Sequence, residues 1–526
     1  MTQGPRAAIV RLRPEDNIAV ATRTLEPGTA VSANGASLKV AERIGMGHKV
    51  ALQPIRRGEP VRKYGQVIGF ASDDVPAGAW VHTHNVEPGQ FDRDYAFATE
   101  VPPLPAAQAP RTFQGYRRPG GKVGTRNYIA VISTVNCSAS TSKYITGRIG
   151  PDVLSDFPNV DGVVAITHKA GCAMQLGGPD HLQLERVLAG FARHPNVGAY
   201  LLVGLGCETG QAVHLIENQG LVQIPPGVPS PQQRGRVRVG AVPPKVLTIQ
   251  QCGGIGKTVE AGVREVLRML PEVNDVRREP IPASELILGT ECGGSDGNSG
   301  VTANPAVGVA SDLLVAQGAT SILAETPEIY GAEHLLTRRA RTREIGEALV
   351  ERIKWWEWYT GVFGAEINNN PSPGNMEGGL TTIYEKSLGA IAKGGSTALC
   401  GVFQYAEPVT AKGFVVMDTP GYDPASITGM VAGGANVCVF TTGRGSCFGC
   451  KPVPSIKIAT NTPMYEHMID DMDLDAGTIL EGESIEEVGR RIFEEILAVA
   501  GGKKTKSELH GVGEEEFTPW SIGPTL

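Results

Sequence analysis

Short apolar segments that alternate with helical patterns constrain the fold of this 526-residue chain more than any other feature. Beyond about residue 115 these segments cover residues 128–135, 162–166, 198–205, 245–249, 286–289, 321–324, 398–402, 437–440 and 456–459. Helical patterns over residues 257–270 and 305–317 follow two of them, and Ser484 and Glu487 form a capping box before a last helix over residues 485–500. Strands that alternate with helices predict α/β architecture with parallel sheets. We therefore expect α/β domains over residues 115–275 and 280–526.

The first hundred residues show a different pattern. Short strands are predicted at residues 17–21, 48–52 and 66–71, separated by Gly- and Pro-containing turns. Closely spaced short strands favour a compact all-β module, which we place at residues 14–99. The Pro-rich segment over residues 100–114 favours an extended linker.

Composition excludes several classes of partner. The net charge is −7 and no long basic run occurs, so no nucleic-acid partner is expected. No stretch approaches 18 consecutive apolar residues, and the N-terminus has no apolar core of signal-peptide length, so no membrane partner is expected either. Nine cysteines without an export signal indicate a cytoplasmic protein with reduced thiols.

Four of the apolar segments are followed by a cysteine in a Gly- or Ser-rich turn. These are Cys137, Cys172, Cys207 and Cys292. Ligands of open α/β sheets bind at the carboxyl ends of the strands, so these thiols can converge there. Thiolates suit iron, an iron–sulfur cluster or zinc. The alternative is that each cysteine is a small buried hydrophobic residue.

Polar groups at other strand ends are further candidates. If His82-Thr83-His84 continues a strand, both imidazoles lie on one face, which suits a divalent metal or a substrate carboxylate. An exposed β-edge is the alternative for this pair. Arg444 follows the strand predicted at 437–440 and is well placed for a carboxylate, unless it forms only a surface salt bridge.

Two further motifs are weaker signals. Cys447-Phe-Gly-Cys450 has no second CxxC, so it can be half a metal site, a redox pair or a plain turn. Gly256-Lys257-Thr258 matches the end of a phosphate-binding loop, but Gln251 stands where that motif requires glycine. The mismatch excludes nucleotide hydrolysis by such a loop.

Many of the motifs match one family in order. They include Gly47-His48-Lys49, His82-x-His84-Asn85, Val123-Gly-Thr-Arg-Asn127, His168-x-x-Gly-Cys172, Gly204-Leu-Gly-Cys-Glu208, Glu291-Cys-Gly-Gly-Ser-Asp296, Asn370-Pro-Ser-Pro-Gly-Asn375, Phe440-Thr-Thr-Gly-Arg-Gly445 and Lys457-Ile-Ala-Thr460. From about residue 16 to 510 the chain resembles altronate and galactarate dehydratases. The segment Ala324-Glu-Thr-Pro-Glu328 resembles the altronate branch more, whereas Cys447-Phe-Gly-Cys450 departs from both branches and leaves the exact substrate open.

The resemblance implies a fold and an activity. It implies an N-terminal β-clip (SAF-type) domain and a C-terminal Rossmann-like variant. It also implies a homodimer that removes water from an aldonate or aldarate to give a 2-keto-3-deoxy acid. The implied cofactor is Fe²⁺, mononuclear or in an iron–sulfur cluster, with Mn²⁺ as a substitute. The other functions considered are a carbon–sulfur lyase on a sulfonated hydroxy acid and a non-catalytic binding protein.

Roles for individual residues follow from this chemistry. The leading iron ligands are Cys172, Cys207 and Cys292, with Cys137 as a fourth. A mononuclear site drawn from His82, His84, His168, Glu208 and Asp296 is the alternative. His168 is the first choice for proton transfer, and Glu208 and Asp296 are further catalytic candidates. Substrate-binding groups are expected at His48, Asn304, Asn375, Arg444 and Lys457.

Overall fold

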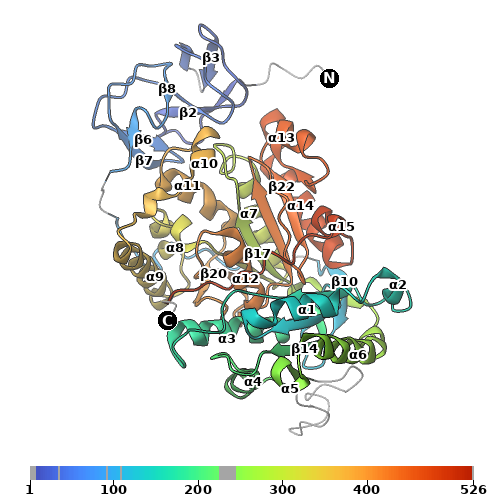
Figure 1. Ribbon diagram of the computed structural model, residues 1–526. Helices are drawn as coiled ribbons and strands as arrows, with labels where there is room; N and C mark the ends of the chain where they lie inside the picture. The colour runs from blue at the N-terminus through green and yellow to red at the C-terminus, as the bar shows by residue number, and fades with distance from the viewer. Residues whose placement is uncertain (1–6, 34–35, 90–92, 107–108, 224–243, 524–526) are drawn as a thin grey trace.

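The computed structural model describes residues 7–33, 36–89, 93–106, 109–223 and 244–523. It confirms the α/β class: an antiparallel β module at the N-terminus is followed by two parallel sheets (Figure 1). In Figure 1 the N-terminal module lies at one end of the large sheet and the middle domain lies at the other.

The N-terminal module is built from strands of two to six residues. Its four-stranded sheet has the order β1-β2-β5-β8, a three-stranded sheet has the order β6-β7-β9, and β3 and β4 form a pair. The strands are β1 (Ile9–Val10), β2 (Ile18–Ala21), β3 (Ala30–Ala33), β4 (Ala36–Lys39), β5 (Lys49–Ala51), β6 (Pro60–Lys63), β7 (Gln66–Ala71), β8 (Trp80–Val81) and β9 (Val86–Glu87). The strands predicted at 17–21, 48–52 and 66–71 are confirmed as β2, β5 and β7.

The middle domain contains a four-stranded parallel sheet of order β13-β12-β14-β15. Its strands are β12 (Tyr128–Ser133), β13 (Gly162–Ile166), β14 (Val197–Gly204) and β15 (Lys245–Thr248). Beside it, β10 (Thr112–Arg117) pairs with β11 (Val123–Gly124) and β16 (Glu279–Pro282). Strand β10 begins inside the segment predicted as a linker, and residues 107 and 108 of that segment lie outside the described residues.

The C-terminal domain contains a parallel sheet of seven strands in the order β19-β20-β18-β17-β21-β22-β23. The strands are β17 (Ile287–Cys292), β18 (Thr320–Leu323), β19 (Leu399–Phe403), β20 (Gly413–Met417), β21 (Val437–Thr442), β22 (Ser455–Ala459) and β23 (Leu474–Asp475). Strands β18, β19 and β20 lie on one side of β17, and the chain then crosses to place β21, β22 and β23 on its other side. The order of the strands therefore reverses between β17 and β21.

Helices cover both large sheets. The helices longer than ten residues are α3 (Pro179–Ala192), α6 (Ile255–Asn274), α7 (Ala303–Ala316), α9 (Arg343–Val362), α12 (Asp423–Gly433) and α14 (Ile485–Ala500). The shorter helices are α1 (Ala139–Thr146), α2 (Pro151–Leu154), α4 (Ala212–Gln219), α5 (Ile249–Cys252), α8 (Glu333–Arg338), α10 (Pro373–Glu377), α11 (Ile383–Ala390), α13 (Thr462–His467) and α15 (Lys506–His510). Single 3-10 turns are η1 (Asn136–Ser138), η3 (Ala283–Glu285), η4 (Thr326–Glu328), η5 (Ile367–Asn369), η6 (Ile391–Gly394) and η7 (Gly477–Glu481). No helix of the described chain is both long enough and apolar enough to cross a membrane.

Helix α14 has the bounds predicted from sequence. The Ser484 side chain accepts from the backbone N–H of Glu487, and the Glu487 side chain accepts from the backbone N–H of Ser484. This capping box satisfies two N–H groups at the start of the helix. Ile492 and Ile496 are fully buried against α7, so the apolar face of α14 fixes the helix on the sheet.

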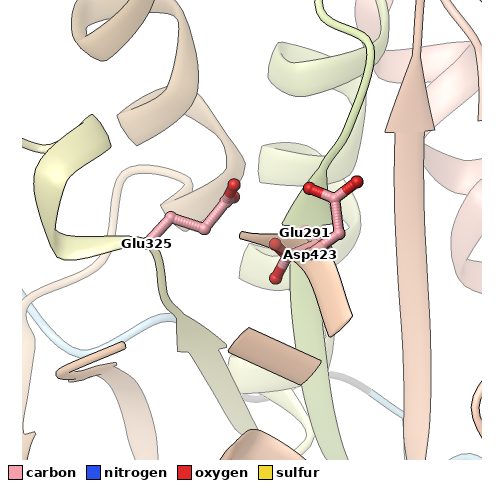
Figure 2. A group of neighbouring side chains, drawn as sticks. All are labelled: Glu291, Glu325 and Asp423. Atoms are coloured by element: carbon pink, nitrogen blue, oxygen red, sulfur yellow. The ribbon is translucent and has the colours of Figure 1, made fainter. Parts of the chain in front are cut away.

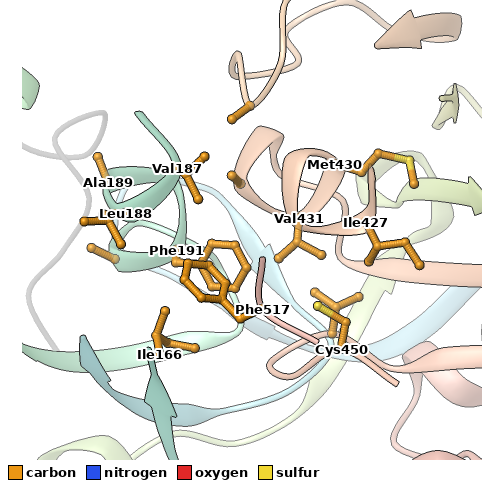
Figure 3. Packing of buried hydrophobic residues seen from close by; sticks show 14 of the residues in the cluster. Ile166, Val187, Leu188, Ala189, Phe191, Ile427, Met430, Val431, Cys450 and Phe517 are labelled. Atoms are coloured by element: carbon orange, nitrogen blue, oxygen red, sulfur yellow. The ribbon is translucent and has the colours of Figure 1, made fainter. Parts of the chain in front are cut away.

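A shared core joins the middle and C-terminal domains. Helix α3 packs on α12, and Gly190 of α3 lies so close to Ala432 that a side chain on the glycine would collide with it. Phe191 meets Phe517 edge to face, with ring centroids 4.6 Å apart, and Val431 lies in the same cluster (Figure 3). Close helix packing over buried aromatic rings stabilises one relative position of the two domains.

A buried ion cluster attaches the N-terminal module to the C-terminal domain. Lys49 Nζ and Lys63 Nζ lie 2.9 and 2.8 Å from the two carboxylate oxygens of Glu385 on α11, and all three side chains are fully buried. Burial lowers the pKa of Lys49 to about 8, with the charge of Lys63 acting in the same direction and Glu385 opposing it. Because both ammonium groups depend on one carboxylate, Glu385 fixes the module in place.

We therefore predict that Glu385→Gln destabilises the protein by about 3–5 kcal/mol, because it leaves buried charges without their partner. Urea denaturation measures the loss. The control is Glu494→Gln, which removes a solvent-exposed pair with Arg111 and should cost no more than about 1 kcal/mol. Equal losses in the two variants would contradict the role assigned to Glu385.

Candidate functional site

Three carboxylates meet at the carboxyl edge of the seven-stranded sheet. Glu291 is the penultimate residue of β17, and Glu325 follows β18. Asp423 is the first residue of α12, the helix that follows β20. Their ligand oxygens all lie within 4.8 Å of one another, and Figure 2 shows Glu325 extending toward the other two. Since β20, β18 and β17 are adjacent and parallel, the fold itself brings these three side chains together.

The carboxylate cluster lies beside the point where the strand order reverses. Strands β17 and β21 are neighbours in the sheet, but their following connections run to opposite sides. In open α/β sheets, such a reversal leaves a crevice at the carboxyl ends of the strands, where ligands bind. Glu291 on β17 and Arg444 after β21 border this position.

Burial and mutual repulsion raise the pKa values of the three carboxyl groups, so these groups keep their protons to a higher pH than usual. Burial raises the pKa of Glu291 well above its ordinary value, and the charges of Glu325 and Asp423 raise it further. Burial also raises the pKa of Glu325 to about 7 and that of Asp423 to about 6, with the charge of Glu328 adding to both shifts. Lys393 opposes these shifts and lies 2.8 Å from Glu325. The surroundings therefore do not balance the negative charge that appears when all three carboxyl groups ionise.

The charge balance and donor atoms of the cluster fit a divalent cation. Glu328 pairs with Lys386 at 2.6 Å and Glu325 pairs with Lys393 at 2.8 Å, so the two lysines balance only two of the four acids once all four are deprotonated. Oε1 of Glu291 and Oε1 of Glu325 are buried without a hydrogen-bond partner. Carboxylate oxygens are ligands for Mg²⁺ and Mn²⁺ and also serve Fe²⁺. The iron implied by the family resemblance therefore fits this site, which sequence reasoning had placed among cysteines and histidines.

A glycine-rich loop follows Glu291 and passes over the cluster. A side chain on Gly293 would collide with Asp423, and one on Gly297 would collide with the backbone of Gly47 in the N-terminal module. Asp296, within the loop, is buried and accepts hydrogen bonds from Ser299 N and Thr460 Oγ1 at 2.9 and 3.0 Å. The structure therefore places Asp296 where it holds the loop together, and a catalytic role for it remains a prediction.

Histidines of the N-terminal module lie beside this loop. His48 Nε2 lies 3.1 Å from the Glu377 carbonyl, and His48 Nδ1 accepts from Trp80 Nε1. The His82 ring stacks on Trp80, with centroids 4.9 Å apart, and its Nδ1 is buried without a hydrogen-bond partner. Burial and the nearby Lys49 ammonium lower the pKa of His82 to about 3, so the ring is neutral at physiological pH. The free nitrogen of this neutral ring can accept a hydrogen bond.

The strand proposed for His82 and His84 does not extend that far. Strand β8 ends at Val81, because Asn85 Oδ1 accepts from the backbone N–H of His82 and Asn85 Nδ2 donates to Trp80, which together close a turn. His82 is buried whereas His84 is exposed. The two imidazoles therefore do not form the one-faced pair expected of a strand.

Of the expected substrate-binding residues, Arg444 is the most accessible. Its guanidinium is half exposed and lies 3.3 Å from the Glu377 carboxylate. Asn304 and Asn375 are buried instead. Asn304 bonds to Gly389 O and Thr441 Oγ1, and Asn375 bonds to Ser295 O. In the structure both amides hold neighbouring loops.

The expected metal-binding cysteines fall in two places. Cys137, Cys172 and Cys207 are exposed at the carboxyl edge of the middle-domain sheet. Cys292 is buried in the C-terminal domain, where its Sγ lies 2.7 Å from Ser295 Oγ and burial raises its pKa. The structure therefore separates Cys292 from the other three.

His168 and Glu208 lie in the middle domain beside its cysteines. His168 Nε2 lies 3.0 Å from Ser133 O, and its Nδ1 accepts from Ala170 N. Burial lowers the pKa of His168 to about 4. Glu208 accepts from Leu205 N and Thr134 Oγ1, both at 3.0 Å. Both side chains bond to the loops that carry the cysteines, and neither forms a hydrogen bond with the three carboxylates in the described part of the chain.

The CxxC segment packs on the shared core, where the Phe448 ring stacks on Phe440. Cys450 is buried in the shared core, whereas Cys447 is exposed, and the two are not disulfide-bonded. Lys457, which is also buried, donates from Nζ to the Phe448 carbonyl at 3.1 Å. Its ammonium thus holds the CxxC turn, and carboxylate binding by Lys457 remains a prediction.

Sequence reasoning overlooked the residues that form the carboxylate cluster. Glu291 and Glu325 stand at the ends of two predicted strands, so the rule applied to cysteines would also have found them. Asp423 gave no such signal, because β20, the strand before it, was not predicted. Lys386 and Lys393 belong to a helix and a 3-10 turn whose polar face is buried, which no surface pattern reveals.

Comparison with known proteins agrees with this architecture. The altronate/galactarate dehydratase SAF domain matches residues 7–89, the second domain of D-galactarate dehydratase/altronate hydrolase matches 115–274, and the D-galactarate/altronate dehydratase C-terminal domain matches 283–525. The chain is 35% identical to altronate dehydratase of Escherichia coli (strain K12), over 98% of this chain and 99% of that protein.

Two other relatives show a similar degree of identity. Altronate dehydratase of Bacillus subtilis (strain 168) is 34% identical over 99% of this chain and 100% of its own length. Galactarate dehydratase (L-threo-forming) of Escherichia coli (strain K12) is 39% identical over 95% of this chain and 94% of its own length. Fold, site and comparisons together define a hydro-lyase. The chain belongs to the altronate/galactarate dehydratase family.

We predict that divalent cation binding at the carboxylate cluster strengthens as the pH rises from about 5 to 8. Without a cation, the folded state retains protons on Glu325 and Asp423 that the unfolded chain releases near their ordinary pKa values. Stability therefore falls as the pH rises from those ordinary values up to about 6 for Asp423 and about 7 for Glu325. A cation displaces those protons. Mn²⁺ should therefore raise the melting temperature more at pH 8 than at pH 6.

The variants Glu291→Gln and Asp423→Asn provide the comparison for this titration. Each should lose most of the Mn²⁺-dependent shift, whereas Glu494→Gln, an exposed acid, should retain it. An undiminished shift in the first two variants would show that the ion binds elsewhere.

Proposed function

We propose that this enzyme dehydrates an altronate-like aldonate to a 2-keto-3-deoxy acid, with Fe²⁺ held by Glu291, Glu325 and Asp423. The observation that carries the proposal is the partnerless carboxylate oxygens at the strand reversal. The names of the full-length relatives support the substrate class. The reversal between β17 and β21 also supports the expected Rossmann-like variant.

The reaction requires one proton transfer on each side of a carbon–carbon bond. A base removes the proton from C2, and the C2–H electron pair forms the C2–C3 double bond as the C3–O bond breaks. The departing hydroxide takes a proton and leaves as water, and the enol then tautomerises to the 2-keto acid. A bound divalent cation supplies Lewis-acid stabilisation of the negative charge on the substrate carboxylate and C2 oxygen.

Residues at the domain boundary supply the other roles. Arg444 is accessible and suits a carboxylate, because its guanidinium donates two parallel hydrogen bonds. His82 is the proposed base, since its Nδ1 atom is buried without a hydrogen-bond partner. Lys386 and Lys393 remain charged beside the cluster and oppose its negative charge.

We predict that anaerobically purified, iron-loaded protein converts altronate to a 2-keto-3-deoxy acid. Galactarate, other aldonates and sulfolactate form the rest of the panel, with product followed by a 2-keto-acid assay and by sulfite release. Asp423→Asn should lower turnover at least about a hundredfold, because the cation loses a ligand. Conversion of galactarate alone would overturn the altronate proposal, and sulfite release would indicate a carbon–sulfur lyase.

A second kinetic prediction separates His82 from His168. His82→Gln should lower kcat about 100-fold or more if its imidazole transfers the proton. Arg444→Gln is the contrasting variant at the same site, and it should mainly raise KM. His168→Gln should lower the melting temperature and leave kcat within about tenfold, because it removes bonds within the middle domain. A large kcat loss in His168→Gln with an unchanged melting temperature would instead support His168 as the base.

A further inference from the structure

Every strand of the middle-domain sheet is followed by a cysteine at the same edge. Cys137 comes four residues after β12, Cys172 six after β13, Cys207 three after β14 and Cys252 four after β15. All neighbouring strands in this sheet are parallel, so their carboxyl ends lie together. Cys292, which sequence reasoning grouped with Cys137, Cys172 and Cys207, instead follows a strand of the other sheet.

Direct hydrogen bonds join the loops that carry these cysteines. Asn136 N donates to Ala170 O and Gly210 N donates to Gly171 O, both at 3.0 Å. These bonds lie within three residues of Cys137, Cys172 and Cys207. Gln250 Nε2 lies 3.4 Å from Cys207 Sγ, which brings the loop after β15 to the same place. Three thiols are thus held on adjacent and mutually bonded loops.

The exposure of these three thiols is unusual for free cysteines. Cys137, Cys172 and Cys207 are all exposed, whereas Cys292, Cys438 and Cys450 are buried. Unpaired cysteines are among the most buried residues of proteins, because they behave as small apolar groups. Several exposed thiols on one edge indicate a chemical role. Cys252 is half-buried and packs on the apolar core of the middle domain, as structural cysteines do.

The loops are shaped for close approach. Gly171, with φ of +96°, has no room for a side chain against the backbone of Thr134 and Val135. His168 and Glu208 bond to backbone groups of the same loops. His168 Nδ1 accepts from Ala170 N and its Nε2 contacts Ser133 O, while Glu208 accepts from Leu205 N. A cavity of about 550 Å³ adjoins them and is lined in part by Cys172 and His168.

The sulfur atoms of the three thiols do not converge on one point. Among the described residues, the three carboxylates are the only group of three or more ligand side chains whose donor atoms lie within 4.8 Å of one another. The thiols are therefore not arranged around one ion. In an iron–sulfur cluster each thiolate binds a different iron atom, so the sulfurs need not meet at a single point.

We propose that Cys137, Cys172 and Cys207 bind a [4Fe–4S] cluster, a metal centre separate from the carboxylate site. Each thiol would give up its proton and bind one iron, which would leave the fourth iron without a cysteine ligand. The cluster site is independent of the proposed base and of the cation held by Glu291, Glu325 and Asp423. The middle domain would then bind iron through soft thiolate ligands, and the C-terminal domain would bind it through hard carboxylate oxygens.

Anaerobic reconstitution of the full-length protein with iron and sulfide tests the proposal. We expect about four iron and four sulfide per chain, absorption near 400 nm and an electron paramagnetic resonance signal after reduction. The triple variant Cys137→Ser/Cys172→Ser/Cys207→Ser should lose the absorption and the sulfide. The control Cys447→Ser, which alters an exposed thiol of the C-terminal domain, should retain both.

Further outcomes separate this site from the dehydration site. Asp423→Asn should retain the cluster signal even though it loses activity, so failure of one proposal does not imply failure of the other. Circular dichroism reports whether the triple variant folds. If it does not fold, the single variants provide the test, and each should lose at least half of the absorption near 400 nm. Iron binding without sulfide, zinc in place of iron, or a full signal in the triple variant would each overturn the proposal.

Discussion

Unbalanced negative charge at the carboxyl edge of the large sheet determines how the C-terminal domain is built. Parallel strands β20, β18 and β17 end side by side, and the chain places an acid at or just after each end. Buried carboxylates are costly unless they are paired. Lys386 and Lys393 supply part of that compensation, and the glycine loop after Glu291 leaves room above Asp423. A divalent cation would supply the remainder.

The N-terminal module completes the site through an interaction of the same kind. Glu385 binds Lys49 and Lys63 without solvent, and this fixes the module against the loop that carries Glu377. His48 thereby contacts the Glu377 carbonyl, and His82 packs against His48. Arg444 contacts the side chain of the same Glu377. The histidines and the loop after Glu291 lie more than 200 residues apart in sequence, so docking of the module is what brings Gly47 and its neighbour His48 to this loop.

Secondary structure was largely predictable here, because strand periodicity and capping are local properties. The capping box of Ser484 and the apolar face of α14 fixed that helix to the residue. The strand-end rule also identified the correct edge of each sheet. It failed for Cys292 because the rule cannot tell which of two sheets a strand joins. It failed for His82 and His84 because a turn closed by Asn85 ends the strand at Val81.

The number of hydrogen bonds that a buried side chain forms distinguishes the residues that hold loops in place from those that we propose to take part in the reaction. His168, Asp296 and Asn304 have polar atoms committed to neighbouring loops, so little remains to bind a substrate. Glu291, Glu325 and His82 instead keep buried atoms without a partner, which costs about 1–3 kcal/mol for each group. A cation or a substrate bound at the free positions would offset that cost. Spacing in the sequence cannot reveal this difference, because partners such as Gly389 and Ser133 are fixed only by the fold.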